Sequence, residues 1–212
     1  VLSAINQMIA RERDIDRVFE EACRIAVEIG GFRMVWVGLN DPVLGELRPV
    51  AYAGVAGDYL QSVHISLNDD ERGRGPTGIA LREGRHVLCH NFATDPRMGP
   101  WRDRALGLGY HSSAAFPLIV AGTVRGAFTL YAGVAEFFND QEVRLLDGLA
   151  ADISFAMEAA EAETARQQAT AQLLQSEARF SSIFHGSPLA IGIGSYAAGG
   201  ALIEVNPAWL RL

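Results

Sequence analysis

Residues 111–133 read HSSAAFPLIVAGTVRGAFTLYAG, two runs of apolar and β-branched residues separated by a small-residue turn. The first run covers residues 111–120 and the second covers 123–133, with Ala121-Gly122 as the two-residue connection that is typical of a hairpin. This stretch is the clearest hairpin signal in the chain. It predicts an antiparallel pair of strands with the rest of a sheet built around it.

Further β-type runs precede this hairpin. Residues 32–39 and 47–53 are separated by the turn Asn40-Asp41-Pro42 and should form a second hairpin. Shorter runs at 63–67 and 86–91 predict two more strands. Asp14 is a good N-cap for a helix whose apolar residues recur at helical spacing up to Ile29, and Gly30-Gly31 should end it.

Two loops separate these strands. Residues 68–76 are polar and rich in glycine, and they lead into a short helix predicted for residues 77–83. A longer loop contains Asp95-Pro96 and Gly99-Pro100 and is followed by a short helix at about residues 101–108. A long loop over a sheet is where the lid of a pocket is expected.

A long helix is predicted for residues 139–179. Its mostly apolar seam positions are spaced alternately by three and four residues, as in a coiled coil, although an alanine-rich helix matches such a pattern easily. Such a helix is too long to pack wholly on one domain, so its far half should need a partner helix. The predicted seam is Val143, Leu146, Ala150, Ile153, Met157, Ala160, Thr164, Gln167, Ala171, Leu174 and Ala178.

Composition limits the function. The chain has 212 residues, 49% of them hydrophobic, and a formal net charge of −7. An acidic chain lacks the basic surface that nucleic acids and anionic membranes attract, and no apolar run is long enough to cross a bilayer. We therefore expect a cytoplasmic fragment of a larger protein, with Cys23 and Cys89 reduced and buried.

Several motifs together resemble the GAF family. They are GRGPTGIALREG at residues 73–84, Asp95-Pro96, Trp101-Arg102, GYHSSAAFPL at 109–118, Gly122, Gly126 and the Phe137, Glu142, Leu145-Leu146 pattern. The resemblance implies an α/β (α+β) fold, with an antiparallel sheet of five to six strands flanked by helices. It also implies a small-molecule cavity on one face of that sheet.

The end of the chain resembles the start of a PAS domain, through Glu177-Ala-Arg-Phe180, Ile183-Phe184, Ser187-Pro188 and Val205-Asn-Pro-Ala-Trp209. The expected organisation is a GAF domain at 1–138, a signalling helix at 139–179 and an incomplete PAS segment at 180–212. Two short strands around Gly199-Gly200 should lack a completed core. A GAF domain followed by a PAS domain is similar to the sensory halves of bacterial histidine kinases and of enzymes that make or degrade cyclic-di-GMP.

A ligand cavity should be mostly apolar with a few convergent polar groups. Trp36 and Tyr52 can supply aromatic walls. Arg102 can fix a carboxylate or phosphate, or it can instead bind Asp95 or Asp103 and pin the loop. Of the adjacent Ser112 and Ser113, only one can face a ligand. The full candidate set is Trp36, Tyr52, Thr77, Asp95, Trp101, Arg102, His111 and Ser113.

Several specific ligands and activities are disfavoured. His111 without a second feature is weak support for haem, and Cys89-His90 lies in a predicted strand rather than where phytochrome-like GAF domains attach bilin. His86 and His90 are too far apart along a strand to hold one metal. The lone Cys89 cannot form the disulfide of GAF-type methionine sulfoxide reductases, and the set typical of cyclic-nucleotide GAF domains is not recognisable.

The sequence therefore predicts a non-catalytic sensor module. It would bind an unidentified small molecule, form a homodimer through the C-terminal helix and pass a signal to a PAS domain and an output domain outside this chain. The alternative is a structural dimerisation module whose cavity stays empty.

Overall fold

The structure is a computed structural model, and it describes residues 9, 12, 14–56, 59–195 and 201–211. The chain divides into two compact units, Val1–Ala160 and Glu161–Leu212, which are considered separately below. One predicted feature, the turn around Gly199-Gly200, lies outside the described residues.

The first unit is built on a six-stranded sheet with the order β3-β2-β1-β6-β5-β4, in which every pair of neighbours is antiparallel. This confirms the predicted α+β fold and its sheet of five to six strands. The strands are β1 (Met34–Asp41), β2 (Glu46–Gly54), β3 (Ile65–Ser66), β4 (Val87–Cys89), β5 (Ser112–Val120) and β6 (Thr123–Ala132).

The hairpin from which the sequence analysis started is confirmed. Strands β5 and β6 pair from Ser112–Ala132 to Val120–Thr123, and the two turn residues both have positive φ, 48° at Ala121 and 77° at Gly122. Positive φ at both turn positions matches the right-handed twist of the strands that the turn joins. The hairpin then contributes its other edge, β6, to pairing with β1.

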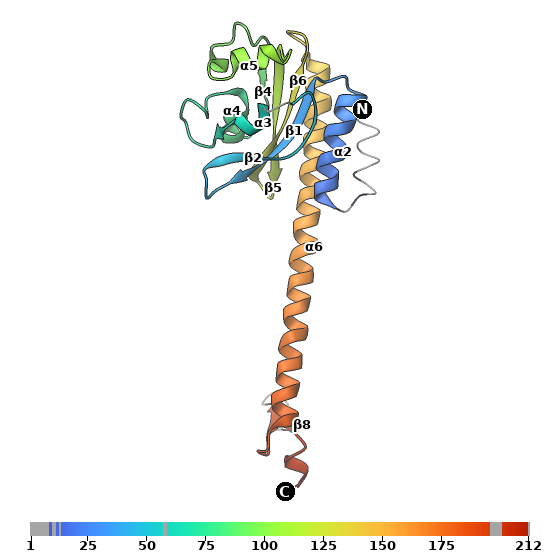
Figure 1. Ribbon diagram of the computed structural model, residues 1–212. Helices are drawn as coiled ribbons and strands as arrows, with labels where there is room; N and C mark the ends of the chain where they lie inside the picture. The colour runs from blue at the N-terminus through green and yellow to red at the C-terminus, as the bar shows by residue number, and fades with distance from the viewer. Residues whose placement is uncertain (1–8, 10–11, 13, 57–58, 196–200, 212) are drawn as a thin grey trace. The chain divides into compact units, whose positions relative to one another are not determined.

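Helices cover both faces of the sheet (Figure 1). On one face lie α2 (Ile15–Glu28) and the first part of α6, whose apolar residues form one core with alternate residues of the strands. On the other face, α3 (Tyr59–Ser62), α4 (Pro76–Glu83) and α5 (Arg102–Gly107) cover a second core that includes Trp36 and Tyr131. Helix α3 was not predicted from the sequence.

Helix α4 is held against the preceding loop by two glycines. Pro76 occupies its first turn, and Gly84, with a φ of 63°, ends it. A Cβ atom at Gly78 would lie 2.2 Å from the carbonyl oxygen of Gly73, and one at Gly75 would lie 2.6 Å from the Trp101 ring. The motif GRGPTG therefore needs glycine where the loop backbone and the helix touch.

Helix α6 runs from Asp140 to Gly186, seven residues further than the predicted end at residue 179. No glycine or proline interrupts residues 180–185, and the rings of Phe180 and Phe184 stack one helical turn apart, so helix formation continues to Gly186. The first five positions of the predicted seam, Val143 to Met157, are buried in the core of the first unit. The later positions from Thr164 to Ala178 are exposed in this chain.

The second unit contains the end of α6, the hairpin of β7 (Gly192–Ser195) and β8 (Ala201–Val205), and the short η3 (Trp209–Arg211). Asn206 is fully buried and ties these parts together. Its amide donates to the carbonyls of Phe184 and Leu189 and accepts from the N–H groups of Ile191 and Trp209. Large apolar side chains nevertheless remain exposed here, among them Ile183, Leu189, Ile203 and Leu210.

We expect Gly78→Ala to lower the free energy of unfolding by about 1–3 kcal/mol, because the new methyl group forces the loop away from α4. Gly148→Ala is the matched control, since a Cβ at this exposed helical position meets nothing within 4 Å. The control should leave stability unchanged or raise it by up to about 1 kcal/mol. Thermal denaturation followed by circular dichroism measures both, and equal melting temperatures would contradict the close packing of α4.

Candidate ligand cavity

A small cavity lies between the sheet and the layer of short helices. Its volume is about 20 Å³. Ser113 of β5 and Tyr131 of β6, which are paired across the two strands, form its floor. The walls are the first turn of α4, the α3–β3 segment and the lid loop, and the lining residues are Tyr59, Val63, Ile65, Arg72, Gly75, Pro76, Thr77, Gly78, Met98 and Trp101.

The volume decides what fits in this conformation. A site needs roughly 10–15 Å³ to hold one water molecule, whereas pockets for drug-sized ligands span roughly 300–1,000 Å³. A cavity of about 20 Å³ accommodates one or two water-sized groups. Anything larger requires the lid or the loop before α4 to move.

Ser113 is the polar group at the floor of the cavity. Its side chain is only 3% exposed, and its hydroxyl has no hydrogen-bond partner among the described residues. The neighbouring Ser112 points to the other face and donates to the carbonyl oxygen of Val134 at 2.8 Å. Thr77 also lines the cavity, and its hydroxyl is 3.5 Å from that of Thr129. The Ser113 hydroxyl is therefore available to a molecule in the cavity, which has room for one or two water-sized groups.

Three tyrosines surround the floor. The Tyr131 ring lies 4.8 Å from that of Tyr110 and 6.0 Å from that of Tyr59, both measured between centroids. The Tyr110 hydroxyl donates to the carbonyl of Val55. Burial raises the pKa of Tyr131 to about 12 and that of Tyr59 well above its ordinary value. These phenols therefore stay protonated and act as aromatic walls rather than as bases.

The lid loop is pinned by arginines, but not through the contacts that the sequence suggested. Arg102 donates to the carbonyl oxygens of Phe92 at 3.1 Å and of Asp95 at 2.7 Å, and it does not line the cavity. The Asp95 carboxylate is instead held by Arg97 at 2.6 Å, and this bond lowers the pKa of Asp95 below its ordinary value. Arg102 thus has the loop-pinning role, with backbone carbonyls in place of Asp95 or Asp103 carboxylates.

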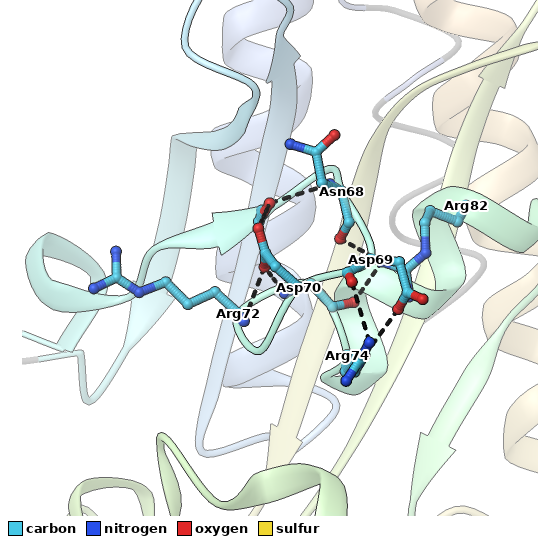
Figure 2. Close-up of polar contacts among 8 residues, drawn as sticks. Asn68, Asp69, Asp70, Arg72, Arg74 and Arg82 are labelled. Carbon is cyan, nitrogen blue, oxygen red and sulfur yellow. Dashed lines mark hydrogen bonds and ion pairs between the residues drawn. The ribbon is translucent and has the colours of Figure 1, made fainter.

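The loop before α4 holds its own set of charges (Figure 2). Asp69 pairs with Arg74 at 3.0 Å and with Arg82 at 3.7 Å, and Arg82 also donates to the carbonyl of Gly73 at 2.5 Å. Asp70 accepts from the Ser66 hydroxyl and from the N–H groups of residues 72 and 73. Arg72 differs from the other two arginines, because its guanidinium extends away from this cluster and makes no hydrogen bond or close ion pair with it, and the residue lines the cavity.

The structure places three of the eight sequence-predicted candidates in the cavity lining: Thr77, Trp101 and Ser113. Trp36 is buried in the core beneath, and half-buried His111 uses its backbone to bond Phe92 and Ala132. Tyr52 shares a register position with Trp36, yet it is 59% exposed and lies away from the cavity.

Sequence reasoning missed Tyr59, Arg72 and Tyr131. Tyr131 could have been predicted from the sequence, because the register of the β5–β6 hairpin places it opposite Ser113. Arg72 carried no distinguishing signal, since the same loop contains Arg74 and neither sequence position shows which arginine faces inward.

This arrangement, a six-stranded antiparallel sheet with a cavity beneath a GRGPTG helix start, can now be compared with known proteins. The model of the GAF domain matches residues 12–158. The chain belongs to the GAF domain family. No characterised protein sequence matches it at a significant level.

Solved structures show the same fold. The free methionine-R-sulfoxide reductase of Neisseria meningitidis, solved with its substrate, has a TM-score of 0.66 and 21% identity over 77% of this chain and 89% of that one. The GAF domain of a Coxiella burnetii phosphoenolpyruvate-protein phosphotransferase has a TM-score of 0.64 and 17% identity, with 77% and 94% covered. A domain of a putative Sinorhizobium meliloti two-component sensor histidine kinase has a TM-score of 0.56 and 21% identity, with 72% and 96% covered.

Metal ligands, membrane spans and reactive thiols also bear on what the site can do. Among the described residues, no cluster of three histidine, cysteine or acidic side chains is placed to bind a metal. No helix in that part of the GAF chain has the length and apolarity needed to span a bilayer. Both cysteines are buried and unpaired, as the sequence predicted, and burial raises the pKa of each thiol to about 12.

We expect both thiols to be unreactive in the folded protein. At about pH 8 neither should form a reactive thiolate, so Ellman's reagent should label none of the native cysteines and both after denaturation. Absorbance of the released chromophore counts the labelled thiols. Rapid labelling of either cysteine in the native protein would contradict the burial of both thiols.

We also expect stability to fall in alkaline solution. The thiols ionise near 9.0 ordinarily and near 12 in the folded chain. The folded state therefore binds these protons more tightly, and its stabilisation is complete below about pH 9 and is lost as the pH rises toward 12. Urea midpoints measured from neutral pH upward should decrease beyond about pH 9, and Cys89→Ala should reduce that dependence. A midpoint that stays constant over this range would contradict the expectation.

Proposed function

We propose that this GAF domain is a sensory module of a bacterial signalling protein, in which a small molecule binds in the cavity and changes the packing of α6. The observation that carries the proposal is Ser113, a residue only 3% exposed whose hydroxyl makes no hydrogen bond in the described chain, on the floor of a cavity that the GAF fold forms. Polar groups from three separate segments, Arg72, Thr77 and Ser113, converge there. Convergence of this kind is what a small-ligand site requires.

Strand β5 connects the cavity to α6. Ser113 lines the cavity, while Ala114, Phe116 and Leu118 belong to the core that α6 shares on the opposite face. The N–H of Ile119 donates to the Ser154 hydroxyl of α6 at 3.0 Å. A ligand that displaces β5 therefore changes the contacts between β5 and α6. The bound and free states then differ in these contacts, as a ligand-driven change requires.

The signalling context rests on the segment after the GAF core. Helix α6 continues to Gly186 and is followed by the β7–β8 hairpin and then by Asn206-Pro207, which resembles part of the start of a PAS domain. We propose that the helix leads into a PAS domain and then into a cytoplasmic output domain, either a histidine kinase or a cyclic-di-GMP enzyme. The structural likeness to a domain of a putative sensor histidine kinase agrees with this setting.

We further propose that the chain itself is not an enzyme. The neisserial structure that shares its fold is a reductase, but here Cys89 is buried and burial raises its pKa to about 12. A buried thiol of that kind is a poor nucleophile.

A second function, ligand-free dimerisation, is favoured by one observation. The cavity of about 20 Å³ is far smaller than an ordinary ligand pocket. In that case the domain would serve to hold two chains together, with a vestigial cavity.

Both functions use a homodimer through α6. The exposed seam after Ala160 is the surface proposed for the partner helix, and its largest apolar residue is Leu174.

Leu174→Lys should raise the dimer dissociation constant by at least about tenfold, because it places a charge in an apolar seam. Leu173→Lys is the matched control, since Leu173 is equally exposed, 60% against 61%, but lies outside the seam. Sedimentation equilibrium measures both constants. Equal effects of the two substitutions would refute the seam, and a monomeric parent chain would refute the dimer.

Native mass spectrometry tests the two functions against each other. A dimer that carries a small mass, lost under denaturing conditions, supports the sensor. Ser113→Leu should then fill the cavity and abolish that mass, whereas Tyr52→Ala, which alters an exposed residue outside the cavity, should retain it. A dimer without bound mass, together with increased thermal stability of Ser113→Leu, supports the dimerisation module.

A further inference from the structure

We infer that the cavity is a receptor site for a short-chain monocarboxylate, with its carboxylate held by the first turn of α4, the Ser113 hydroxyl and the Arg72 guanidinium. The inference rests on the proposed sensory function and adds the chemical class of the ligand. Three independent features of the described residues support it, and each concerns a different element of the fold.

The first feature is the N-terminus of α4. Four consecutive residues of its start, Gly75 to Gly78, line the cavity. The N-cap Gly75 has no side chain to cap the helix, and the N–H groups of Thr77 and Gly78 have no acceptor within the described part of the chain. Free N–H groups and the helix dipole favour an anion at this position.

The second feature is Ser113. It is almost completely buried, faces the cavity and has no hydrogen-bond partner among the described residues. Its O–H can donate to an oxygen that also accepts from the α4 N–H groups. A ligand in the cavity can therefore accept hydrogen bonds from the start of α4 on one side and from Ser113 on the other.

The third feature is the sign of the charge around the cavity. Of the arginines on this loop and on α4, Arg74 and Arg82 are bound to Asp69, whereas Arg72 lines the cavity and its guanidinium lies apart from that cluster (Figure 2). Among the described lining residues none is acidic, and the nearby Asp70 carboxylate already accepts from three donors. The lining therefore carries a net positive charge in a protein whose formal net charge is −7.

Size and polarity select the carboxylate among anions. About 20 Å³ admits one or two water-sized groups, so the two oxygens of a carboxylate fit beside α4 and Ser113. A short hydrocarbon chain then requires the movement of the lid or loop described above, and the four oxygens of a phosphate require a larger one. A guanidinium binds a carboxylate through two parallel hydrogen bonds. The opposite wall is apolar, with Val63, Ile65 and Met98, and it suits a short hydrocarbon chain.

The test is calorimetric titration of the whole chain with sodium acetate and sodium propionate at constant ionic strength. Acetamide, which is neutral and of the same size, and inorganic phosphate serve as comparison probes. We expect both carboxylates to bind and acetamide and phosphate to bind at least about tenfold more weakly. Arg72→Gln and Ser113→Ala should each weaken acetate binding by about tenfold.

Arg74→Gln is the matched control, because Arg74 lies on the same loop and pairs with Asp69 away from the cavity. It should leave acetate binding unchanged, and melting temperatures without acetate show that each variant is folded. Equal binding of acetate and acetamide, or equal effects of Arg72→Gln and Arg74→Gln, overturns the carboxylate inference while leaving a ligand cavity. Failure of both carboxylates to bind also overturns it, and native mass spectrometry of the purified chain then decides the sensory function separately.

Discussion

The central constraint on this fold is that its sheet is covered on both faces. Strands β1, β5 and β6 are buried for most of their length on both sides, so each must supply apolar side chains in both directions. One set packs against α2 and α6, and the other packs beneath the short helices and loops. The cavity exists because the second layer is built from short, loop-linked elements, which fill space less completely than two long helices do. The sheet thus separates a firmly packed face from an adaptable one.

Much of this could be read from the sequence, because the signals were local. The Ala121-Gly122 turn, the Asp14 cap and the proline and glycines around α4 each specify backbone geometry within a few residues. The side chains of the site depended instead on distant contacts. Tyr52 shares a face with Trp36, but β3 pairs with β2 only at Glu46 and Leu47, so β3 does not cover the Tyr52 end of the strand. Arg102 could not be assigned because Arg97, two residues from Asp95, takes the carboxylate first.

The polar groups around the cavity fall into two sets: those that bond to other groups of the protein and those that do not. In the loop before α4, Asp69 and Asp70 engage two arginines, a serine and two backbone N–H groups. Those bonds fix the shape of the loop and leave the Arg72 guanidinium outside its hydrogen-bonded cluster. On the lid, Arg97 and Arg102 are fully used in holding loop backbone and Asp95. The groups that remain for a ligand are therefore those that the scaffold does not need for its own stability.

The burial of α6 limits how a signal can leave the domain. Leu146, Leu149, Ile153 and Met157 all face the sheet and are almost fully buried. Turning the helix about its own axis would expose them at about 1.5–3 kcal/mol each, roughly 6–12 kcal/mol together. A ligand can shift an equilibrium only by its difference in affinity for the two states, and micromolar binding supplies about 8 kcal/mol in total. Axial rotation would therefore consume most or all of the binding free energy of a small metabolite. Sub-turn sliding or tilting, which keeps the apolar stripe of α6 on the sheet, avoids that cost.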